Sequence, residues 1–396
     1  MNPPNEDDQH GGDGSTTAPS RIPLRLADLQ KNITMAQIAK AAGVSQGAIS
    51  SLLNDRDYGI RVSEKTRERV FKVCREMGYL PNDLRAVVRM YPELGDFAML
   101  ISSRFAEGLA NPTVGRIAAA ALKAVPSTAG SLTFAFYDED TDYLLTPDLL
   151  PHPAGTGTVS KFIFVGPANP SLIQSVTRRE HAVVSLCYDI PLPGVQSIIP
   201  DLPGAAALAI QHLAKLGHRR LAIVSGPFGS TEAQIIDLNH GVRLACEKAG
   251  VTLEAENVIH GDLSRSAGMA AFDALAERKL EPTAIFCLSD SAAAGVLARA
   301  HARGLQIPAQ LTVVGCGDNP SAASLFPPLT TVRLPLEEIA ALGVREVDRM
   351  AGSGEVAEPH KTVLPASLVV RETSGPLEGA SPRASAKSSR AKTSPR

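Results

Sequence analysis

The chain has 396 residues, 44% of them hydrophobic, which is enough for two or three domain cores. No apolar run approaches the roughly 18 residues of a membrane-spanning helix, and the absence of Trp argues against a stacking platform for single-stranded nucleic acid. The net charge of −2 hides a contrast, because residues 31–91 carry +5, residues 379–396 carry +5 and residues 92–378 carry −9. We therefore expect a polyanionic partner for the basic N-terminal segment.

Both ends of the chain are polar. Residues 1–32 are rich in Gly, Pro, Ser, Thr and Asp, and residues 375–396 are rich in Ser and basic residues, so we expect two disordered tails. The basic tail is either a solvated extension or a segment that attracts DNA non-specifically. The N-terminal residues contain no secretory signal pattern, and the five cysteines include no CxxC pair. We expect a cytoplasmic protein with reduced thiols and without a metal site, a cofactor or a membrane anchor.

Residues 33–80 contain three short helical patterns with start and stop signals. Hydroxyl side chains at an N-cap accept hydrogen bonds from the first turn, and glycine adopts the left-handed conformation that ends a helix. In chain order these signals are the capping box of Thr34 with Gln37, then Gly43, Ser45, Ser63 and Gly78. The short break between the first two patterns predicts a helix-turn-helix domain.

The second predicted helix has an apolar face and a polar face. The residues at spacings that face the other helices are Val44, Ile49, Leu52 and Leu53. We expect Ser45, Ser50 and Asn54 to contact phosphates, whereas Gln46 and Ser51 read base edges in the major groove. Arg61, between the second and third helices, adds positive charge that favours phosphate. The alternative interpretation is the ordinary surface of a three-helix domain.

Strand and helix patterns alternate over residues 95–374. Runs that predict buried parallel strands are 97–101, 132–137, 161–165, 182–187, 220–225, 284–288 and 312–315. Amphipathic runs that predict helices are 113–124, 204–216, 232–249, 266–278, 290–303 and 336–350. This alternation predicts a doubly wound α/β body, and its length suits two lobes better than one.

Several of these segments resemble the lactose-repressor (LacI/GalR) family. The matching runs are ITMAQIAKAAGVS at 33–45, VSEKTRERV at 62–70, GYLPN at 78–82, LGHRRLAIVSGP at 216–227 and PPLTTV at 327–332. Residues 96–185 match poorly. The resemblance implies a helix-turn-helix head, a hinge at residues 81–94 and a two-lobed body similar to periplasmic binding proteins. It also implies a homodimer that places two recognition helices in successive major grooves of a palindromic, double-stranded DNA operator.

The resemblance assigns further DNA contacts. Thr34 belongs to the matched head, and Gly47 occupies a base-reading position although it has no side chain with which to read. In the hinge, the family folds a short helix on specific DNA and wedges an apolar residue into the minor groove. The corresponding hinge residues here are Asn82, Arg85, Val88 at the wedge position and Arg89. Residues 83–90 contain no Gly or Pro, so a hinge helix is expected.

The resemblance also implies a small-molecule effector in the cleft between the lobes. The positions that correspond to family ligand contacts are Asp189, Leu238, Ser289, Asp290 and Asp318. Leu238 replaces a family Arg, and Gly317 replaces the first of two acidic residues. Because buried hydroxyls need partners, the cleft cannot anchor a sugar in the manner of the family. An unusual effector, a sugar held by other groups and no effector at all remain as alternatives.

No catalytic motif is recognisable in the sequence, which contains no GxSxG, HExxH or P-loop pattern, so we do not expect an enzyme. The acidic residues 138–140 after a predicted strand are expected to form a solvated loop rather than a cation or polyol site. The sequence predicts a sequence-specific transcriptional regulator. We expect a repressor whose DNA binding is controlled by a small-molecule effector. The alternatives are the same regulator without an effector and a two-lobed solute-binding protein, which would not carry the helix-turn-helix.

Overall fold

The computed structural model describes residues 33–54, 62–105, 107–125, 130–178, 181–226, 233–353 and 358–377. The expected N-terminal tail and most of the expected C-terminal tail lie outside these residues. The chain divides into two compact units, one up to Asn82 and one from Asp83 onward. The first unit is the three-helix head, and the second contains the hinge helix and the body.

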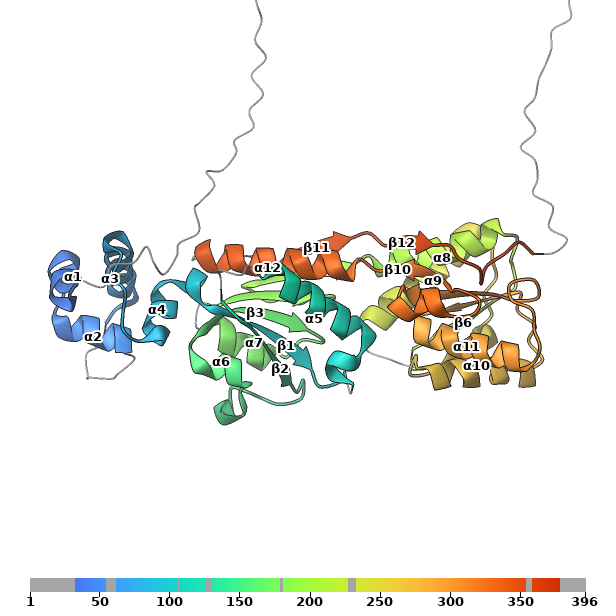
Figure 1. The fold of residues 1–396 in the computed structure, drawn as a ribbon, viewed down its shortest axis with the longest axis horizontal. Coiled ribbons are helices and arrows are strands. Elements are labelled where there is room, and N and C mark those ends of the chain that lie inside the picture. Colours follow the sequence, from blue (N-terminus) through green and yellow to red (C-terminus); the bar gives the residue numbers. More distant parts are fainter. Residues whose placement is uncertain are drawn as a thin grey trace, which may run out of the picture. The chain divides into compact units, whose positions relative to one another are not determined.

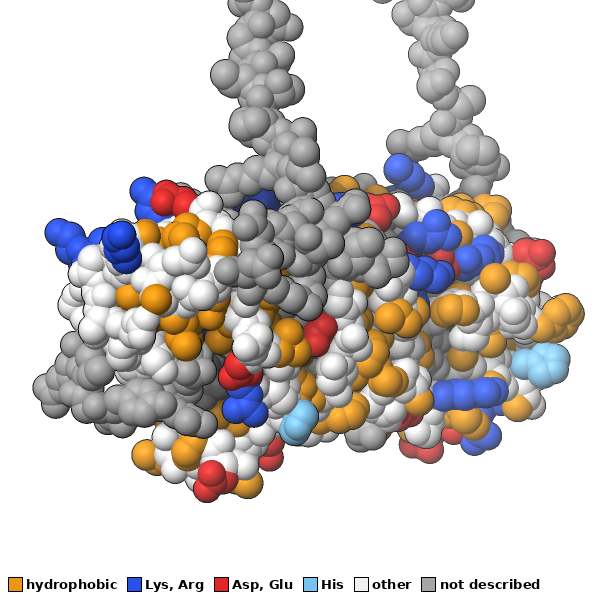
Figure 2. All heavy atoms as spheres, turned by 60° about the vertical axis from the view of Figure 1, so that its left-hand side comes forward, with side chains coloured by type: hydrophobic (Ala, Val, Ile, Leu, Met, Phe, Trp, Pro, Cys, Tyr) orange, Lys and Arg blue, Asp and Glu red, His pale blue; other side chains and the backbone are white. Residues whose placement is uncertain are grey.

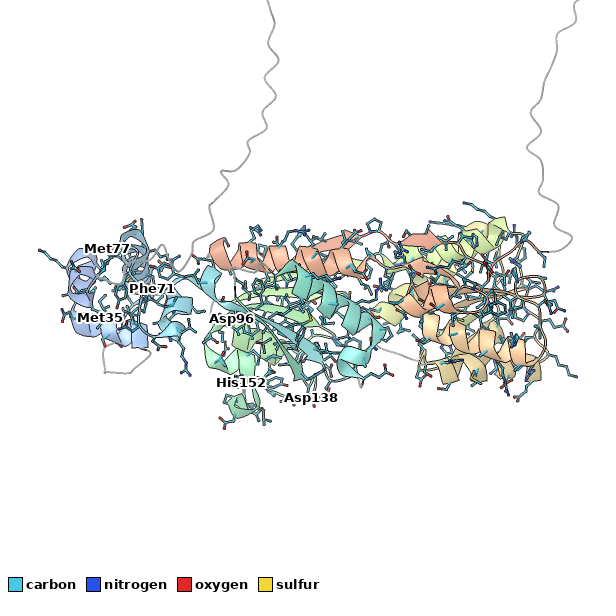
Figure 3. All side chains as sticks on the ribbon, viewed as in Figure 1. Met35, Phe71, Met77, Asp96, Asp138 and His152 are labelled. Atoms are coloured by element: carbon cyan, nitrogen blue, oxygen red, sulfur yellow. The ribbon has the colours of Figure 1, made fainter. Side chains whose placement is uncertain are left out.

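Helices α1 (Met35–Ala42), α2 (Gln46–Asn54) and α3 (Glu64–Met77) form the head. Their buried residues lie three or four positions apart, as an amphipathic helix requires: Ile38, Ala42, Ile49, Leu53, Val70, Phe71 and Cys74. Phe71, labelled in Figure 3, belongs to this core. The predicted caps are confirmed, because Gln37 N donates to Thr34 Oγ1 at 3.3 Å and Gly43 has a φ of 64°.

The first lobe is built on a six-stranded sheet with the order β11-β5-β4-β3-β1-β2. Its strands are β1 (Asp96–Ser102), β2 (Leu132–Tyr137), β3 (Val159–Val165), β4 (Ala182–Leu186), β5 (Val195–Pro200) and β11 (His360–Leu364). All five pairings are parallel. One face packs against α5 (Pro112–Ala124) and α12 (Leu336–Ser353), and the other against α6 (His152–Thr156) and α7 (Pro170–Thr177) (Figure 1).

The second lobe repeats this plan with the order β12-β10-β9-β8-β6-β7. Its strands are β6 (Leu221–Ser225), β7 (Val258–His260), β8 (Ala284–Cys287), β9 (Thr312–Gly317), β10 (Thr330–Arg333) and β12 (Ser367–Val369). Helices α8 (Leu202–Lys215) and α9 (Ala233–Ala249) cover one face, and α10 (Arg265–Glu277) and α11 (Asp290–Ala302) cover the other. Only β12 runs antiparallel to its neighbour among these described strands.

The chain passes between the two lobes three times. It leaves the first lobe after β5, returns after β10 to form α12 and β11, and leaves again to form β12. The last described residues remain attached to the second lobe, since Gly375 N donates to Thr312 Oγ1 at 3.2 Å and Leu377 N donates to Leu216 O at 3.0 Å. The two carboxyl edges of the sheets therefore face a common cleft, as in other open α/β folds.

The predicted doubly wound, two-lobed architecture is confirmed, with each predicted strand and helix present to within a few residues. Five strands were not predicted. Two of them, β7 and β12, are three residues long, and β11 is an edge strand with mostly exposed or half-buried side chains. Short or half-exposed strands lack the continuous apolar run that identified the other seven. The remaining two, β5 and β10, are largely buried, but polar residues such as Gln196, Ser197 and Thr330 interrupt their apolar runs.

Candidate nucleic-acid interface and ligand cleft

Helix α2 presents the face that we expect to approach DNA. Ala48, Ile49 and Leu53 are buried, whereas Gln46 at the first position is exposed. Ser45 precedes the helix and its Oγ accepts from Ala48 N at 3.1 Å, so this hydroxyl both caps α2 and stays exposed. The start of α2 therefore combines a polar, accessible surface with a capped helix end and a buried apolar face, which suits base recognition.

The other expected head contacts are placed as follows. Thr34 is exposed at the start of α1, and Gly47, Ser50 and Ser51 are half-buried on α2. Arg61 and the side chain of Asn54 lie outside the described residues. The role of each residue toward DNA stays a prediction.

Positive charge is exposed on the head. Lys40 lies in the last turn of α1, and Lys65 and Arg69 are exposed on α3. Arg67 differs from them, because its Nη1 lies 3.6 Å from Glu64 Oε1 and its guanidinium lies over the Phe71 ring. Lys40, Lys65 and Arg69 are consequently the better candidates for phosphate contacts that release counterions.

The expected hinge helix is α4 (Leu84–Met90). Asp83 caps it, since Arg85 N donates to Asp83 Oδ1 at 3.0 Å. Asn82 and Arg85 are exposed and Arg89 is half-buried. Val88, the expected wedge, is only 3% exposed, and its Cγ1 lies beside Gly95, whereas Leu84 is 54% exposed. Insertion of Val88 into a groove therefore requires α4 to leave the surface on which it is packed here.

A cleft of about 340 Å³ lies between the lobes at the carboxyl edges of both sheets. Its apolar lining includes Ile235 and Leu238 of α9 and Leu263 and Leu288 of two loops. Its polar lining residues are Glu107, Asn111, Thr113, Gln234, Asp262, Ser264, Ser289, Ser291 and Asn319. No Lys, Arg or His lines the cleft in the part of the chain that the structure describes. Its size and mixed lining suit a small molecule.

Several helices begin at this cleft, and three of them are capped by side chains that line it. Asn111, Ser264 and Ser289 are the N-caps of α5, α10 and α11, and each side chain accepts a hydrogen bond from the first turn of its helix. The positive ends of these helix dipoles point toward the cleft and favour ligand oxygen atoms there. The predictions missed Asn111 and Ser264, although a cap residue shortly after a strand was a signal that could have identified them.

The expected effector contacts separate into two groups. Leu238 and Ser289 line the cleft, although Ser289 Oγ also donates to Leu263 O at 2.6 Å. Asp189, Asp290 and Asp318 are not among the lining residues. Asp189 lies 2.7 Å from Lys361 Nζ on β11. In this structure the three carboxylates are bonded to groups of the protein itself. A role of these residues toward a ligand stays a prediction.

Asp290 and Asp318 form a polar network behind the cleft. Asp290 accepts from Asn319 N at 2.6 Å and from Thr331 Oγ1 at 2.5 Å, and burial raises the pKa of its carboxyl group. Asp318 accepts from Arg333 and Arg371, each at 2.7 Å. Burial acts to raise the pKa of Asp318, but the bonds and charges of the two guanidinium groups hold it below its usual range. This network holds the end of β9 and the loop that follows it, which contribute Gly317 and Asn319 to the cleft.

The acidic residues 138–140 behave differently from one another. Asp138, labelled in Figure 3 beyond the end of β2, is exposed, and so is Asp140. The expectation of a solvated loop is wrong for Glu139, whose side chain is 7% exposed and lies 3.3 Å from Arg104. The loop is packed because Asn169 Nδ2 donates to three of its carbonyl oxygens, at distances of 2.8 to 3.1 Å.

Among the described residues, two side-chain hydrogen bonds span the lobes beside the cleft. Arg116 of α5 donates through Nη1 to Gly317 O at 2.7 Å, and Gln234 of α9 donates through Nε2 to Cys187 O at 2.8 Å. Arg116 also holds the Glu337 carboxylate through Nε and Nη2, at 2.8 and 2.9 Å. The side chains of Arg116 and Gln234 thus join the two lobes next to the place where a ligand would bind.

No helix in the described residues is long and apolar enough to cross a membrane. Basic, acidic and apolar side chains are interspersed over the face that Figure 2 presents. No group of three or more His, Cys, Asp or Glu side chains that could hold a metal ion occurs in the described ranges. All five cysteines are free and buried.

Two family profiles match the chain. The profile described as "Bacterial regulatory proteins, lacI family" matches residues 34–82, and the one described as "Periplasmic binding protein-like domain" matches residues 210–374. HTH-type transcriptional regulator DegA of Bacillus subtilis is 29% identical over 349 residues, which cover 87% of this chain and 98% of DegA. The lactose operon repressor of Escherichia coli is 27% identical over 363 residues, which cover 90% and 96% of the two chains.

Solved structures share the fold along nearly the whole described chain. The complex of the transcriptional regulator CelR with cellobiose is 27% identical, has a TM-score of 0.61 and covers 86% of this chain and 100% of its own. The lac repressor dimer bound to operator and the anti-inducer ONPF is 24% identical, has a TM-score of 0.61 and covers 87% and 100%. At 24% identity, the similarity to the lac repressor structure supports a shared fold and nothing further.

Proposed function

Because this chain belongs to the LacI family of bacterial transcriptional regulators, which bind DNA and are not enzymes, we propose that it represses transcription as a homodimer on a palindromic operator. The observation that carries this proposal is the rigid, capped start of α2 with Gln46 exposed at its first position. A dimer would place two such helices one turn of DNA apart. We place this function in the cytoplasm, where operator DNA is accessible.

The exposed charges of the head support the DNA-binding proposal. Lys40, Lys65 and Arg69 attract phosphate, whereas residues 92–378 carry a net charge of −9, which disfavours contact with DNA through the body. Among known relatives, the lac repressor has been solved as a dimer bound to operator. The same mode of binding for this chain is part of the proposal.

We further propose that a small molecule binds in the cleft and changes the operator affinity. CelR has been solved with cellobiose, and the cleft of this chain offers about 340 Å³ with three helix N-termini and several side-chain hydrogen-bonding groups. The carboxylates of Glu107 and Asp262 line the cleft, and no cation does among the described residues. The cleft therefore favours an uncharged ligand, whose oxygen atoms can face the helix N-termini, over a carboxylate or a phosphate ester.

A regulator without a small-molecule effector is the second candidate. Two observations favour it: the apolar Leu238 stands at a position where the family carries Arg, and Arg116 and Gln234 already join the lobes. In that case the cleft would have no ligand to bind, and the occupancy of the operator would be set by the protein concentration alone.

The operator proposal is tested by selecting bound sequences from a random duplex pool with the purified full-length protein. We expect an enriched pseudo-palindrome, and the variant Gln46→Ala should relax the preference at one symmetric pair of positions, by about 1–3 kcal/mol. The variant Lys65→Ala is the matched control, since loss of a phosphate contact weakens binding evenly across sequences. Enrichment without symmetry would contradict the dimeric operator, and an even loss of affinity in Gln46→Ala would contradict base reading.

A further inference from the structure

The first turn of α12 is connected to the second lobe at the cleft through Arg116 of the first lobe. Leu336 lines the cleft, and the next residue, Glu337, accepts two hydrogen bonds from Arg116 of the first lobe. The remaining donor of the same guanidinium binds Gly317 O, at the end of β9 in the second lobe, at 2.7 Å. Planar guanidinium groups hold such a geometry firmly. A relative movement of the lobes therefore acts on Arg116 and, through it, on Glu337.

The far part of α12 is bonded to the segment that follows the hinge helix. Lys161 of β3 is fully buried, its Nζ lies 2.7 Å from Asp348 Oδ1 on α12, and it donates to Glu93 O at 2.8 Å. The same ammonium lies 4.3 Å from the centroid of the Phe97 ring. A buried ammonium is tolerated only with partners of this kind, because its desolvation costs several kcal/mol. Lys161 thus joins α12 to the short 3₁₀ helix Pro92–Leu94.

This short helix continues directly from α4. Tyr91 N donates to Val87 O at 2.7 Å at the end of α4, and Ser160 Oγ, the neighbour of Lys161, donates to Pro92 O at 2.5 Å. Two consecutive residues of β3 consequently hold two consecutive carbonyl groups after the hinge helix. A shift of Ser160 and Lys161 would therefore move Pro92 and Glu93, which lie only two and three residues after the end of α4.

Helix α12 is suited to carry a displacement between these two ends. Its buried face packs on the first-lobe sheet, and Gly343 allows it to lie so close to Leu186 that an added Cβ would be 2.5 Å from Leu186 Cδ2. Glu337 and Asp348 are eleven residues apart, a helical rise of about 16 Å. Tightly packed helices move as units rather than deforming along their length.

We propose that α12 is a rigid link which reports the state of the cleft to the hinge helix, with Arg116 as the positioning residue at the cleft end and Lys161 at the hinge end. When the lobes separate, Gly317 O withdraws from Arg116, Glu337 and α12 shift, and the hold of Lys161 on Glu93 changes. Its consequence for operator affinity rests on the proposed function. The coupling itself requires neither DNA nor a ligand.

The test is hydrogen exchange, followed by mass spectrometry, on the full-length protein without DNA. The variant Arg116→Gln should raise the exchange rate of residues 84–95, about 2- to 30-fold, although it lies at the other end of α12. Asp348→Asn should raise the same rates, and the double variant should exchange no faster than the faster single variant. Glu338→Gln is the matched control, because the side chain of Glu338 is exposed beside Glu337 and makes no hydrogen bond or ion pair with the described residues.

A change in Arg116→Gln that is confined to the cleft, or additive effects in the double variant, would overturn the proposal. The double variant Lys161→Met/Asp348→Leu separates coupling from stability, because replacing both partners of a buried ion pair by apolar residues can leave the midpoint of thermal unfolding unchanged or raise it. We expect this variant to raise exchange at residues 90–95 without a lower midpoint, and unchanged exchange there would also overturn the proposal. A protein that passes these tests and selects no operator would refute the proposed function alone.

Discussion

Asp318 accepts hydrogen bonds from Arg333 and Arg371 while its own side chain is only 7% exposed. Its neighbour Gly317 is a cleft residue, so the carboxylate, through its two cations, helps to hold the backbone of the cleft. Asp290 does the same from the other side, through Thr331 and the amide of Asn319. At these two positions, charged side chains hold the backbone that lines the cleft in place.

The variant Asp318→Asn should lower the free energy of unfolding by about 1–3 kcal/mol at pH 7, because two guanidinium groups lose their counter-charge. The measurement is urea unfolding followed by circular dichroism. The control variant Glu346→Gln, which removes an exposed ion pair with Arg349, should change the free energy by less than about 0.5 kcal/mol.

The pH dependence follows from the same carboxylate. The pKa of Asp318 is lower in the folded protein than in the unfolded chain, so its stabilisation is complete above the unfolded pKa and is lost as the pH falls through the folded pKa. The difference between the wild type and Asp318→Asn should therefore shrink below about pH 4. A difference that persists undiminished at lower pH would show that Asp318 acts through shape rather than charge.

Helices α10 and α11 cross with their backbones in contact. An added Cβ at Gly268 would meet Ala292 O, and one at Gly295 would meet Arg265 O, both closer than any real Cβ contact. This crossing fixes the starts of both helices, and Ser264 and Ser289 at those starts line the cleft. Packing at the element level thus sets the width of the ligand site.

Gly268→Ala should destabilise the protein by about 1–3 kcal/mol, because the added methyl group meets backbone atoms that cannot rotate away. Gly155→Ala on α6 is the matched control, since nothing lies within 4 Å of its added Cβ, and it should stabilise by about 0.5–1 kcal/mol. Chemical unfolding of the two variants measures both effects. Equal effects of the same sign would contradict the backbone-contact account.

The cleft between the lobes is lined by segments that lie far apart in the sequence and come together only in the folded chain. Residues from α5, α9, α11 and the loop after β9 share its lining, and Arg116 and Gln234 join its two sides. A ligand that fits between the lobes would replace or reinforce these bonds and stabilise the folded state by mass action.

A thermal-shift screen with uncharged polyols, carboxylates and phosphate esters tests whether an effector exists. At a concentration 100 times its dissociation constant, a ligand should add about 2.7 kcal/mol to the free energy of unfolding. We expect such shifts from uncharged compounds, and they should vanish in Thr113→Trp, which fills part of the cleft, but persist in Thr113→Ser. Silence across the screen would favour the regulator without an effector, and shifts from phosphate esters alone would contradict the charge argument.

The local sequence was sufficient to predict the head and the order of the body. Cap residues such as Thr34 and Ser63 and terminal glycines such as Gly43 act within one turn, so the sequence predicts the helices that they bound. Buried parallel strands are continuous apolar runs, which identified seven of the strands. The resemblance in residues 33–82 then indicated DNA binding.

Long-range packing decided what local patterns could not. Nothing near Lys161 in the sequence shows that it is fully buried against Asp348, and nothing near Arg116 shows that it binds Gly317, about two hundred residues away. Likewise Val88 matches a wedge by position, but the fold covers it and exposes Leu84. Contacts between distant segments depend on how the two sheets and their helices are stacked, which short-range periodicity does not encode.

The contrast in net charge between residues 31–91 and residues 92–378 also separates what the sequence determines from what the tertiary structure decides. The sequence by itself determined that a basic helix-turn-helix segment precedes an acidic α/β body, because charge, caps and periodicity are local properties. Only the tertiary structure decided which groups face the cleft, which carboxylates are bonded within the protein, and that α12 spans from the cleft to the hinge. The physical reason is that burial and ion pairing are properties of neighbours in space, and the chain supplies those neighbours only after it folds.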